Sequence, residues 1–202
     1  VDWLRTGRAV LSMFTGGDIQ GGSTITQQLI KNITGYNETT VKRKITEIVR
    51  ALRFTQNYSK EDTITYYLNI SPLGAGCDGV GSASLAYFGK PVSELTLAEC
   101  ASLIAITNNP SRYGPYSDAR VATSTGEMWT ARQWNKWRQE LVLSNMLEQG
   151  MISQEEHDEA VAQELVFQRA EGEDAPQEIY SWYEETVIAD VSRDLEEQLG
   201  WS

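Results

Sequence analysis

Apolar residues recur with helical spacing along most of the chain, and this periodicity limits the fold more than any other feature. Between residues 39 and 56 they stand at i, i+4, i+7, i+8 and i+11, as Val41, Ile45, Ile48, Val49 and Leu52. Such spacing places side chains on one face of a helix, which we expect to be buried. Strand-like alternation never extends beyond a few residues. The sequence therefore predicts an all-α fold.

Capping residues and glycines mark where the helices begin and end. Thr96 with Glu99 and Ser153 with Glu156 have capping-box spacing, and Gly89 and Gly150 stand where helices would close. We expect helices over about 24–33, 39–56, 59–69, 82–89, 96–106, 126–148, 153–167 and 179–199. Residues 1–167 would form one domain, 168–178 an acidic linker, and 179–202 an amphipathic helix.

The charge balance excludes one class of partner and leaves another open. A net charge of −11 argues against nucleic acid, which needs clustered basic residues. Basic residues nevertheless outnumber acids in the first 60 positions, so an anionic ligand fits there. Cys77 and Cys100 lack metal-ligand spacing, and we interpret them as buried or idle thiols. No apolar run is long enough to span a bilayer.

The segment GGSTITQQLIKN, residues 21–32, gathers uncharged hydrogen-bonding groups at the start of a helix. Thr24 and Gln27 fit a capping box, and a helix start offers unpaired N–H groups with partial positive charge. One face would carry Thr24, Gln27, Gln28 and Lys31, opposite Ile25, Leu29 and Ile33. That face suits sugar hydroxyls and a phosphate. The alternative is a well-capped amphipathic helix whose polar face meets water.

The segment KRKITE, residues 42–47, is a second candidate. Arg43 and Glu47 are four residues apart and Lys44 and Glu47 three apart, on the face away from Ile45 and Ile48. One interpretation is an exposed ion pair contributing a few tenths of a kcal/mol. The other is a carboxylate held among cations beside an anionic substrate.

Both segments resemble the second and third signature motifs of the family 51 peptidoglycan glycosyltransferases. The resemblance continues through YSKEDTITYYLN, GVGSASLAYFGK, LTLAECASLIAITNNPSRYGP and VLSNMLEQGMIS, over roughly residues 2–165. It implies a lysozyme-like α-helical fold with a membrane-facing jaw. It also implies polymerisation of lipid II into glycan strands at the extracytoplasmic face of the bacterial membrane. The reaction inverts the anomeric carbon and releases undecaprenyl pyrophosphate, often with Mg²⁺ or Mn²⁺.

The resemblance assigns roles to individual residues. It makes Glu47 the catalytic acid that supports the pyrophosphate end, directly or through a metal, with Arg43 and Lys44 as phosphate cations. Asn69 matches the Tyr-Leu-Asn motif. The positions matching the donor cleft are Gly22, Ser23, Thr24, Gln27, Gln28 and Lys31.

One departure from the family bears on activity. Its first motif, Glu-Asp followed by an aromatic residue and His, supplies the general base and is not found in this sequence, whose only acids before Gly21 are Asp2 and Asp18. Without that base we expect a loss of roughly 10²–10⁴-fold in rate. We interpret the chain as an excised piece of a longer protein. A lipid-pyrophosphate-binding fragment and a lysozyme-like peptidoglycan hydrolase remain as alternatives.

The two ends of the chain prompt further expectations. Near the start, an apolar set either packs on the domain or forms part of the jaw at the membrane surface: Trp3, Leu4, Leu11, Met13 and Phe14. The helix at 179–199 resembles the connection toward a transpeptidase domain. No Ser-x-x-Lys motif occurs here, so penicillin binding is not expected of this chain. The Trp-rich stretch 126–137 resembles an insertion without an assigned role.

Overall fold

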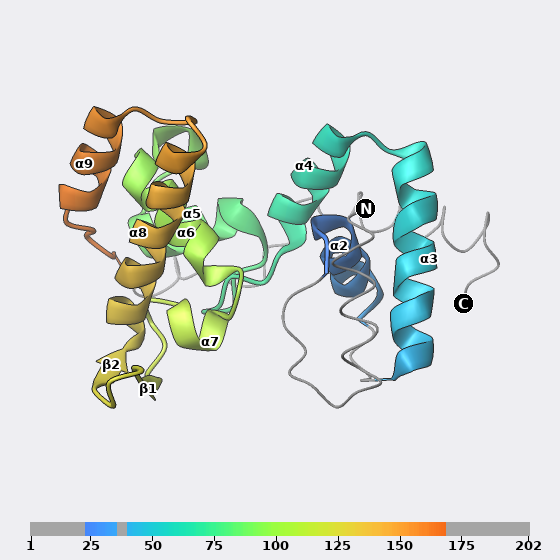
Figure 1. Ribbon diagram of the computed structural model, residues 1–202, viewed down its shortest axis with the longest axis horizontal. Helices are drawn as coiled ribbons and strands as arrows, with labels where there is room; N and C mark the ends of the chain where they lie inside the picture. The colour runs from blue at the N-terminus through green and yellow to red at the C-terminus, as the bar shows by residue number, and fades with distance from the viewer. Residues whose placement is uncertain (1–22, 36–39, 169–202) are drawn as a thin grey trace. The chain divides into compact units, whose positions relative to one another are not determined.

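A computed structural model describes residues 23–35 and 40–168, which fall into two compact units divided after Ile70 (Figure 1). Several predictions lie outside the described residues: Gly22, the apolar set Trp3, Leu4, Leu11, Met13 and Phe14, most of the linker, and the helix at 179–199. They stay predictions, as do the domain boundaries. No helix in the described part of the chain is long and apolar enough to cross a membrane.

The described part of the first unit consists of three helices: α2 (Ile25–Thr34), α3 (Val41–Asn57) and α4 (Lys60–Ile70). Helix α2 packs against both α3 and α4 (Figure 1). The core between them contains Leu29, Ile30, Ala51, Phe54 and Ile70. Side chains cap two of these helices: Thr24 accepts from the Gln27 amide at 3.3 Å and Ser59 from the Asp62 amide at 3.0 Å.

Helix α3 buries a different face from the one expected. Its buried residues are Lys44, Glu47, Ala51 and Phe54, whereas Ile45 is 54% exposed. The prediction that the apolar stripe of α3 forms the core was therefore wrong. Lys44 and Glu47 turn inward because they compensate each other's charge and find polar partners on the start of α2.

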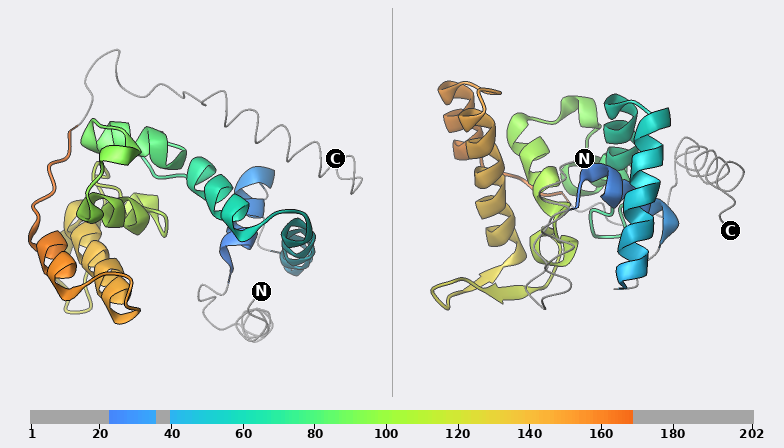
Figure 2. Two further views of the ribbon diagram at one scale, coloured as in Figure 1. Left: turned by 90° about the horizontal axis from the view of Figure 1, so that it is seen from above. Right: turned by 45° about the vertical axis from the view of Figure 1, so that its right-hand side comes forward.

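The second unit is also mainly helical. Its elements are α5 (Gly79–Phe88), the 3₁₀ turn η1 (Val92–Glu94), α6 (Leu97–Ile106), α7 (Pro110–Tyr113), β1 (Arg120–Ala122), β2 (Met128–Thr130), α8 (Ala131–Glu148) and α9 (Gln154–Ala162). Helix α8 packs against α6 and α9, and α8 and α9 run side by side in both views of Figure 2. Buried amides join α8 to α6, since Gln139 donates to the Ala98 carbonyl at 2.9 Å. Asn135 donates to the Ser102 carbonyl at 3.1 Å.

Most helix ends in this unit agree with the sequence. The capping boxes at Thr96 and Ser153 both form, and Gly89 closes α5 with a φ of 68°. Segment 108–117, which lies between two of the expected helices, contains the short helix α7. Cys77 and Cys100 are free thiols, the first buried and the second half-buried.

The start of α8 differs from its prediction. Residues 128–130 form strand β2, which pairs antiparallel with β1, and the helix begins only at Ala131. Within the described residues these strands make the only sheet. Thr130 and Gln133 form a capping box that ends the strand, and Trp134 holds the hairpin by donating from Nε1 to the Val121 carbonyl at 3.0 Å. The Trp-rich stretch thus has a packing role.

Candidate active site

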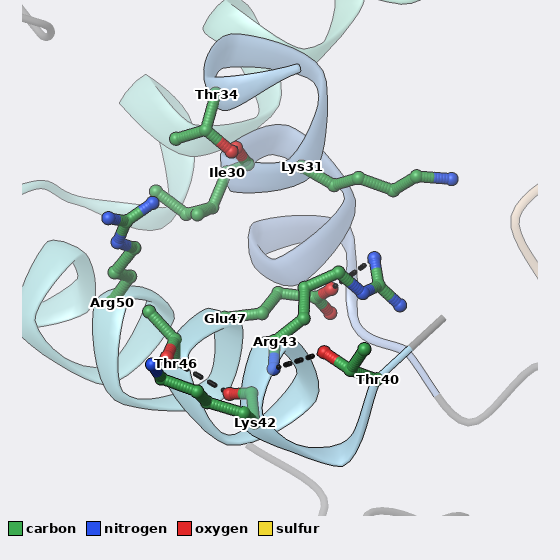
Figure 3. A pocket seen from close by; sticks show the side chains of 9 residues that line it. All are labelled: Ile30, Lys31, Thr34, Thr40, Lys42, Arg43, Thr46, Glu47 and Arg50. Carbon is green, nitrogen blue, oxygen red and sulfur yellow. Dashed lines mark hydrogen bonds and ion pairs between the residues drawn. The ribbon is translucent and has the colours of Figure 1, made fainter. Parts of the chain in front are cut away.

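A pocket of about 270 Å³ lies between α2 and α3 in the first unit (Figure 3). Helix α2 supplies one wall and the first half of α3 the other. The lining residues are Ile30, Lys31, Thr34, Thr40, Lys42, Arg43, Thr46, Glu47 and Arg50. Four of these side chains are basic, and Glu47 is the only acid among them. The pocket therefore favours an anion.

Spacing along α3 spreads the positive charge over the pocket. Arg43 and Arg50 are seven residues apart, which corresponds to about 10 Å along a helix axis. In Figure 3 the Arg50 head lies beside Ile30 and Thr34, whereas the Arg43 head lies on the side of Lys31. Glu47 stands between the two arginines on α3. The cations thus flank the carboxylate instead of clustering at one point.

Glu47 is buried, with 6% of the residue exposed, and both of its oxygens face cations. Its Oε1 accepts from Lys44 Nζ at 2.5 Å, and its Oε2 lies 3.4 Å from Arg43 Nη1. A carboxylate removed from water in this way needs such compensation. Glu47 is therefore a fixed negative charge that orients Arg43 at the pocket wall.

Lys44 lies behind the pocket lining and joins the two helices. Its Nζ donates to Ser23 Oγ at 2.6 Å and to Gln27 Oε1 at 3.2 Å, in addition to Glu47. Ser23 and Gln27 lie at the start of α2 and Glu47 lies on α3, so the GGSTITQQ and KRKITE segments meet at this ammonium.

The polar face expected on α2 is only partly present. Gln27 is 1% exposed, and its Oε1 accepts from Lys44 instead of completing a capping box with Thr24. Ile25, expected on the buried side, is 46% exposed. Gln28 accepts from the Tyr67 hydroxyl at 3.1 Å, which ties α2 to α4. Spacing alone could not reveal that α2 is covered on two sides.

The predicted residues fall into three groups. Lys31, Arg43 and Glu47 line the pocket, whereas Ser23, Gln27 and Lys44 form the network behind it. The remainder, Thr24, Gln28 and Asn69, are not among the lining residues. Asn69 lies on α4 and donates to the Thr65 carbonyl at 2.9 Å.

Sequence reasoning missed three residues of the pocket wall on α3, namely Lys42, Thr46 and Arg50. They follow one another at i, i+4 and i+8, a spacing that puts them on one face. That spacing was a usable signal, although it does not show which face meets α2. Thr46 donates its hydroxyl to the Lys42 carbonyl at 3.0 Å, so its only donor is already used.

The described residues do not fit a protein-held divalent metal. No group of three or more His, Cys, Asp or Glu gathers anywhere in them. The single carboxylate of the pocket, Glu47, already accepts from Lys44 and faces Arg43. A divalent cation bound there would lie next to both of these positive groups, which disfavours it. We therefore assign no step to Mg²⁺ or Mn²⁺.

The first unit is helical and contains a cationic pocket in which a buried acid holds an arginine in place. These features are typical of a protein that binds an anionic group. Residues 1–149 match the transglycosylase family, and the chain belongs to that family. Family membership and the mostly helical structure confirm the expected all-α, lysozyme-like class.

Similar proteins cover most of this chain. Penicillin-binding protein 1A of Aquifex aeolicus is 38% identical over 161 residues, 80% of this chain and 20% of that protein. Penicillin-binding protein 2a of Streptococcus pneumoniae is 34% identical over 195 residues, 95% of this chain and 25% of that protein. The crystal structure of penicillin-binding protein 1A from Haemophilus influenzae matches 88% of this chain and 21% of its own, with 26% identity and a TM-score of 0.44. The chain thus spans about a fifth to a quarter of these relatives.

Proposed function

We propose that this chain is the glycosyltransferase part of a longer cell-wall enzyme, which polymerises lipid II into glycan strands with inversion and release of undecaprenyl pyrophosphate. The cationic pocket supports this proposal most directly, because it belongs to a transglycosylase and carries four basic side chains. Its substrates would be lipid II and the lipid-linked glycan strand. It would act at the extracytoplasmic face of the membrane, covalently joined to a transpeptidase domain.

The chemistry assigned to the pocket is electrostatic. When the bond between the sugar and its diphosphate breaks, negative charge develops on the leaving oxygen. Lys31 and Arg43, which line the pocket, would offset that charge without reorganising during the reaction. Glu47 contributes indirectly, because it holds Arg43 in place through Oε2. The general base on the acceptor 4-hydroxyl would come from outside the described residues.

The arrangement of Glu47 argues against it as that base. Both of its oxygens already interact with cations, so neither is poised to take a proton from a sugar hydroxyl. Because the family motif with the general-base glutamate is not found in this sequence, we propose that turnover by the 202-residue chain alone is weak. Binding of the diphosphate does not need that residue.

Of the two alternatives, binding without catalysis fits the pocket better than hydrolysis. A lysozyme-like hydrolase needs two carboxyl groups flanking the glycosidic bond. Among the described residues, Glu47 is the only acid that lines the pocket, and both of its oxygens face cations. A lipid-pyrophosphate-binding fragment needs only the cations.

A lipid II polymerisation assay, read as glycan strands on a gel, tests the proposed function. The chain would be compared with Glu47→Gln and with Glu61→Gln, which changes an exposed acid at the start of α4. We expect weak strand formation that Glu47→Gln abolishes and Glu61→Gln preserves. Calorimetry with undecaprenyl pyrophosphate is the second arm, because binding without strands favours the fragment that only binds. Cleavage of finished strands would instead favour a hydrolase.

A further inference from the structure

Lys44 has used every hydrogen-bond donor that it possesses. A lysine ammonium carries three N–H groups and no acceptor. The three acceptors here are Ser23 Oγ at 2.6 Å, Gln27 Oε1 at 3.2 Å and Glu47 Oε1 at 2.5 Å. The residue is 8% exposed and is not among those that line the pocket. No donor remains for an anion in the pocket.

We propose that Lys44 is a positioning residue and does not bind the anion, in contrast to the phosphate-binding role that the family resemblance implies. This inference rests on the proposed function. The ammonium links the start of α2 to Glu47 on α3, and Glu47 in turn holds Arg43. We call this set of contacts, made by Ser23, Gln27, Lys44 and Glu47, the lock. Contact with the anion passes to Arg43 and Lys31 at the pocket wall.

The charges explain why the lock needs a cation. Glu47 is buried beside Lys44, and their opposite charges compensate each other. Once Lys44 and Glu47 are counted as neutralising each other, the pocket keeps the positive charges of the basic side chains that line it. If Lys44 lost its charge, Arg43 would be the one cation left beside the Glu47 carboxylate among the described residues. The arginine would then be drawn toward Glu47 and away from a ligand.

For that reason a Lys44→Met variant alone gives an ambiguous result. It weakens anion binding whether Lys44 touches the anion or only restrains Arg43, and it leaves a buried carboxylate with one partner fewer. The double variant Lys44→Met/Glu47→Gln removes one positive and one negative charge, so the net charge of the site is preserved. Thermal unfolding of both variants shows whether the first unit still folds.

Nuclear magnetic resonance of ¹⁵N-lysine ammonium groups separates the two roles directly. In the free protein we expect the Lys44 ammonium protons to exchange with water at least about tenfold more slowly than those of exposed Lys31, because each of them is hydrogen-bonded. On addition of inorganic pyrophosphate, the Lys31 resonance should shift while that of Lys44 stays in place. A Lys44 shift as large as that of Lys31 overturns the proposal.

Calorimetry with inorganic pyrophosphate gives an independent measure. We expect Arg43→Gln to bind at least about tenfold more weakly than the unmodified chain. The double variant should lose less, about threefold, because Arg43 is no longer held in place but keeps its charge. Equal losses in the two variants would make Lys44 a ligand and refute the lock. The Lys60→Met variant, at an exposed lysine on α4, controls for nonspecific loss of charge.

Failure of the lock and failure of the proposed function give different results. Slow exchange at Lys44 that disappears in Glu47→Gln supports the lock without any ligand. If pyrophosphate then moves no lysine resonance, the lock stands and the proposed diphosphate site is wrong. Rapid exchange at Lys44 in the free protein overturns the lock, whatever binds in the pocket.

Discussion

Glu47 Oε2 lies 3.4 Å from Nη1 of Arg43, one helical turn earlier on α3. On an exposed helix this i, i+4 pair would contribute only a few tenths of a kcal/mol. Here the carboxylate is buried and its other oxygen accepts from Lys44, so the pair is part of an enclosed network. Its consequence is geometric, because it decides where the Arg43 head stands in the pocket.

Replacing Glu47 with Ala should destabilise the first unit strongly. The change leaves Lys44 buried with a charge that nothing offsets, and breaking a buried pair in this way costs about 3–5 kcal/mol. Urea unfolding followed by circular dichroism measures the loss. The exposed Glu61→Ala change should stay within about 0.5 kcal/mol. A loss below about 1 kcal/mol for Glu47→Ala would mean that the network is solvated.

Lys31→Ala should weaken binding of a diphosphate without unfolding the domain. Lys31 is exposed and lines the pocket, so its removal costs charge but little packing. We expect about a three- to tenfold rise in the Kd for inorganic pyrophosphate at low salt, with a smaller rise at high salt. Calorimetry at two ionic strengths checks this, with Lys60→Ala as the matched control. Unchanged affinity at both ionic strengths would remove Lys31 from the site.

Ile25 and Leu29 share one helical face by spacing, yet the structure predicts very different losses of stability when each is replaced. Leu29 is fully buried and Ile25 is 46% exposed. Leu29→Ala should cost about 2–5 kcal/mol, because it leaves a cavity in the core beside Phe54 and Ile70. Ile25→Ala should cost less than about 1 kcal/mol. Chemical unfolding of the two variants under one condition decides the matter, and equal costs would contradict the packing of α2.

Acid should weaken the second unit partly through Glu99. Burial opposes ionisation of this carboxyl, but hydrogen bonds from Lys90 and Thr96 outweigh it and hold its pKa below the ordinary value of 4.5. The contribution to stability is therefore present above pH 4.5 and lost as the pH falls through the lower pKa of the folded state. Glu99→Gln should destabilise the protein at pH 7 and make little difference near pH 2.

Unfolding by urea at several pH values measures the effect of Glu99→Gln. Glu94→Gln, at an exposed acid in the nearby turn η1, is the control and should follow the unmodified chain. If the free energies of unfolding of Glu99→Gln and the unmodified chain differed by the same amount at both ends of the pH range, the charge of Glu99 would contribute nothing to stability.

Local signals in the sequence predicted the helices well. A cap such as Thr96 with Glu99 involves residues three positions apart, so its chemistry is complete within the segment. The β1–β2 hairpin was missed because each strand has only three residues, too few to establish an alternation. Its place is fixed instead by Trp134, which belongs to the following helix. That contact is tertiary and leaves no periodic trace.

The site shows where periodicity stops being informative. It placed Lys44 and Glu47 on the face of α3 away from Ile45 and Ile48; the structure exposes Ile45 but leaves Ile48 half-buried, one turn from Lys44. It could not say which face meets another helix. Apolar character suggested the wrong one. The burial of Lys44 depends on Ser23 and Gln27, more than fifteen positions earlier in the chain. Only the docking of α2 on α3 brings those acceptors to it.

The walls of the pocket come from two helices, and its basic side chains are divided between them, with Lys31 on α2 and Lys42, Arg43 and Arg50 on α3. Anything that fills the pocket must therefore favour the docked arrangement over the undocked one. Binding of the proposed diphosphate would then be coupled to the docking of α2 on α3, and a ligand at one hundred times its Kd would add about 2.7 kcal/mol to the stability of that arrangement. The proposed substrate would therefore stabilise the packing of α2 on α3 as well as occupy the site.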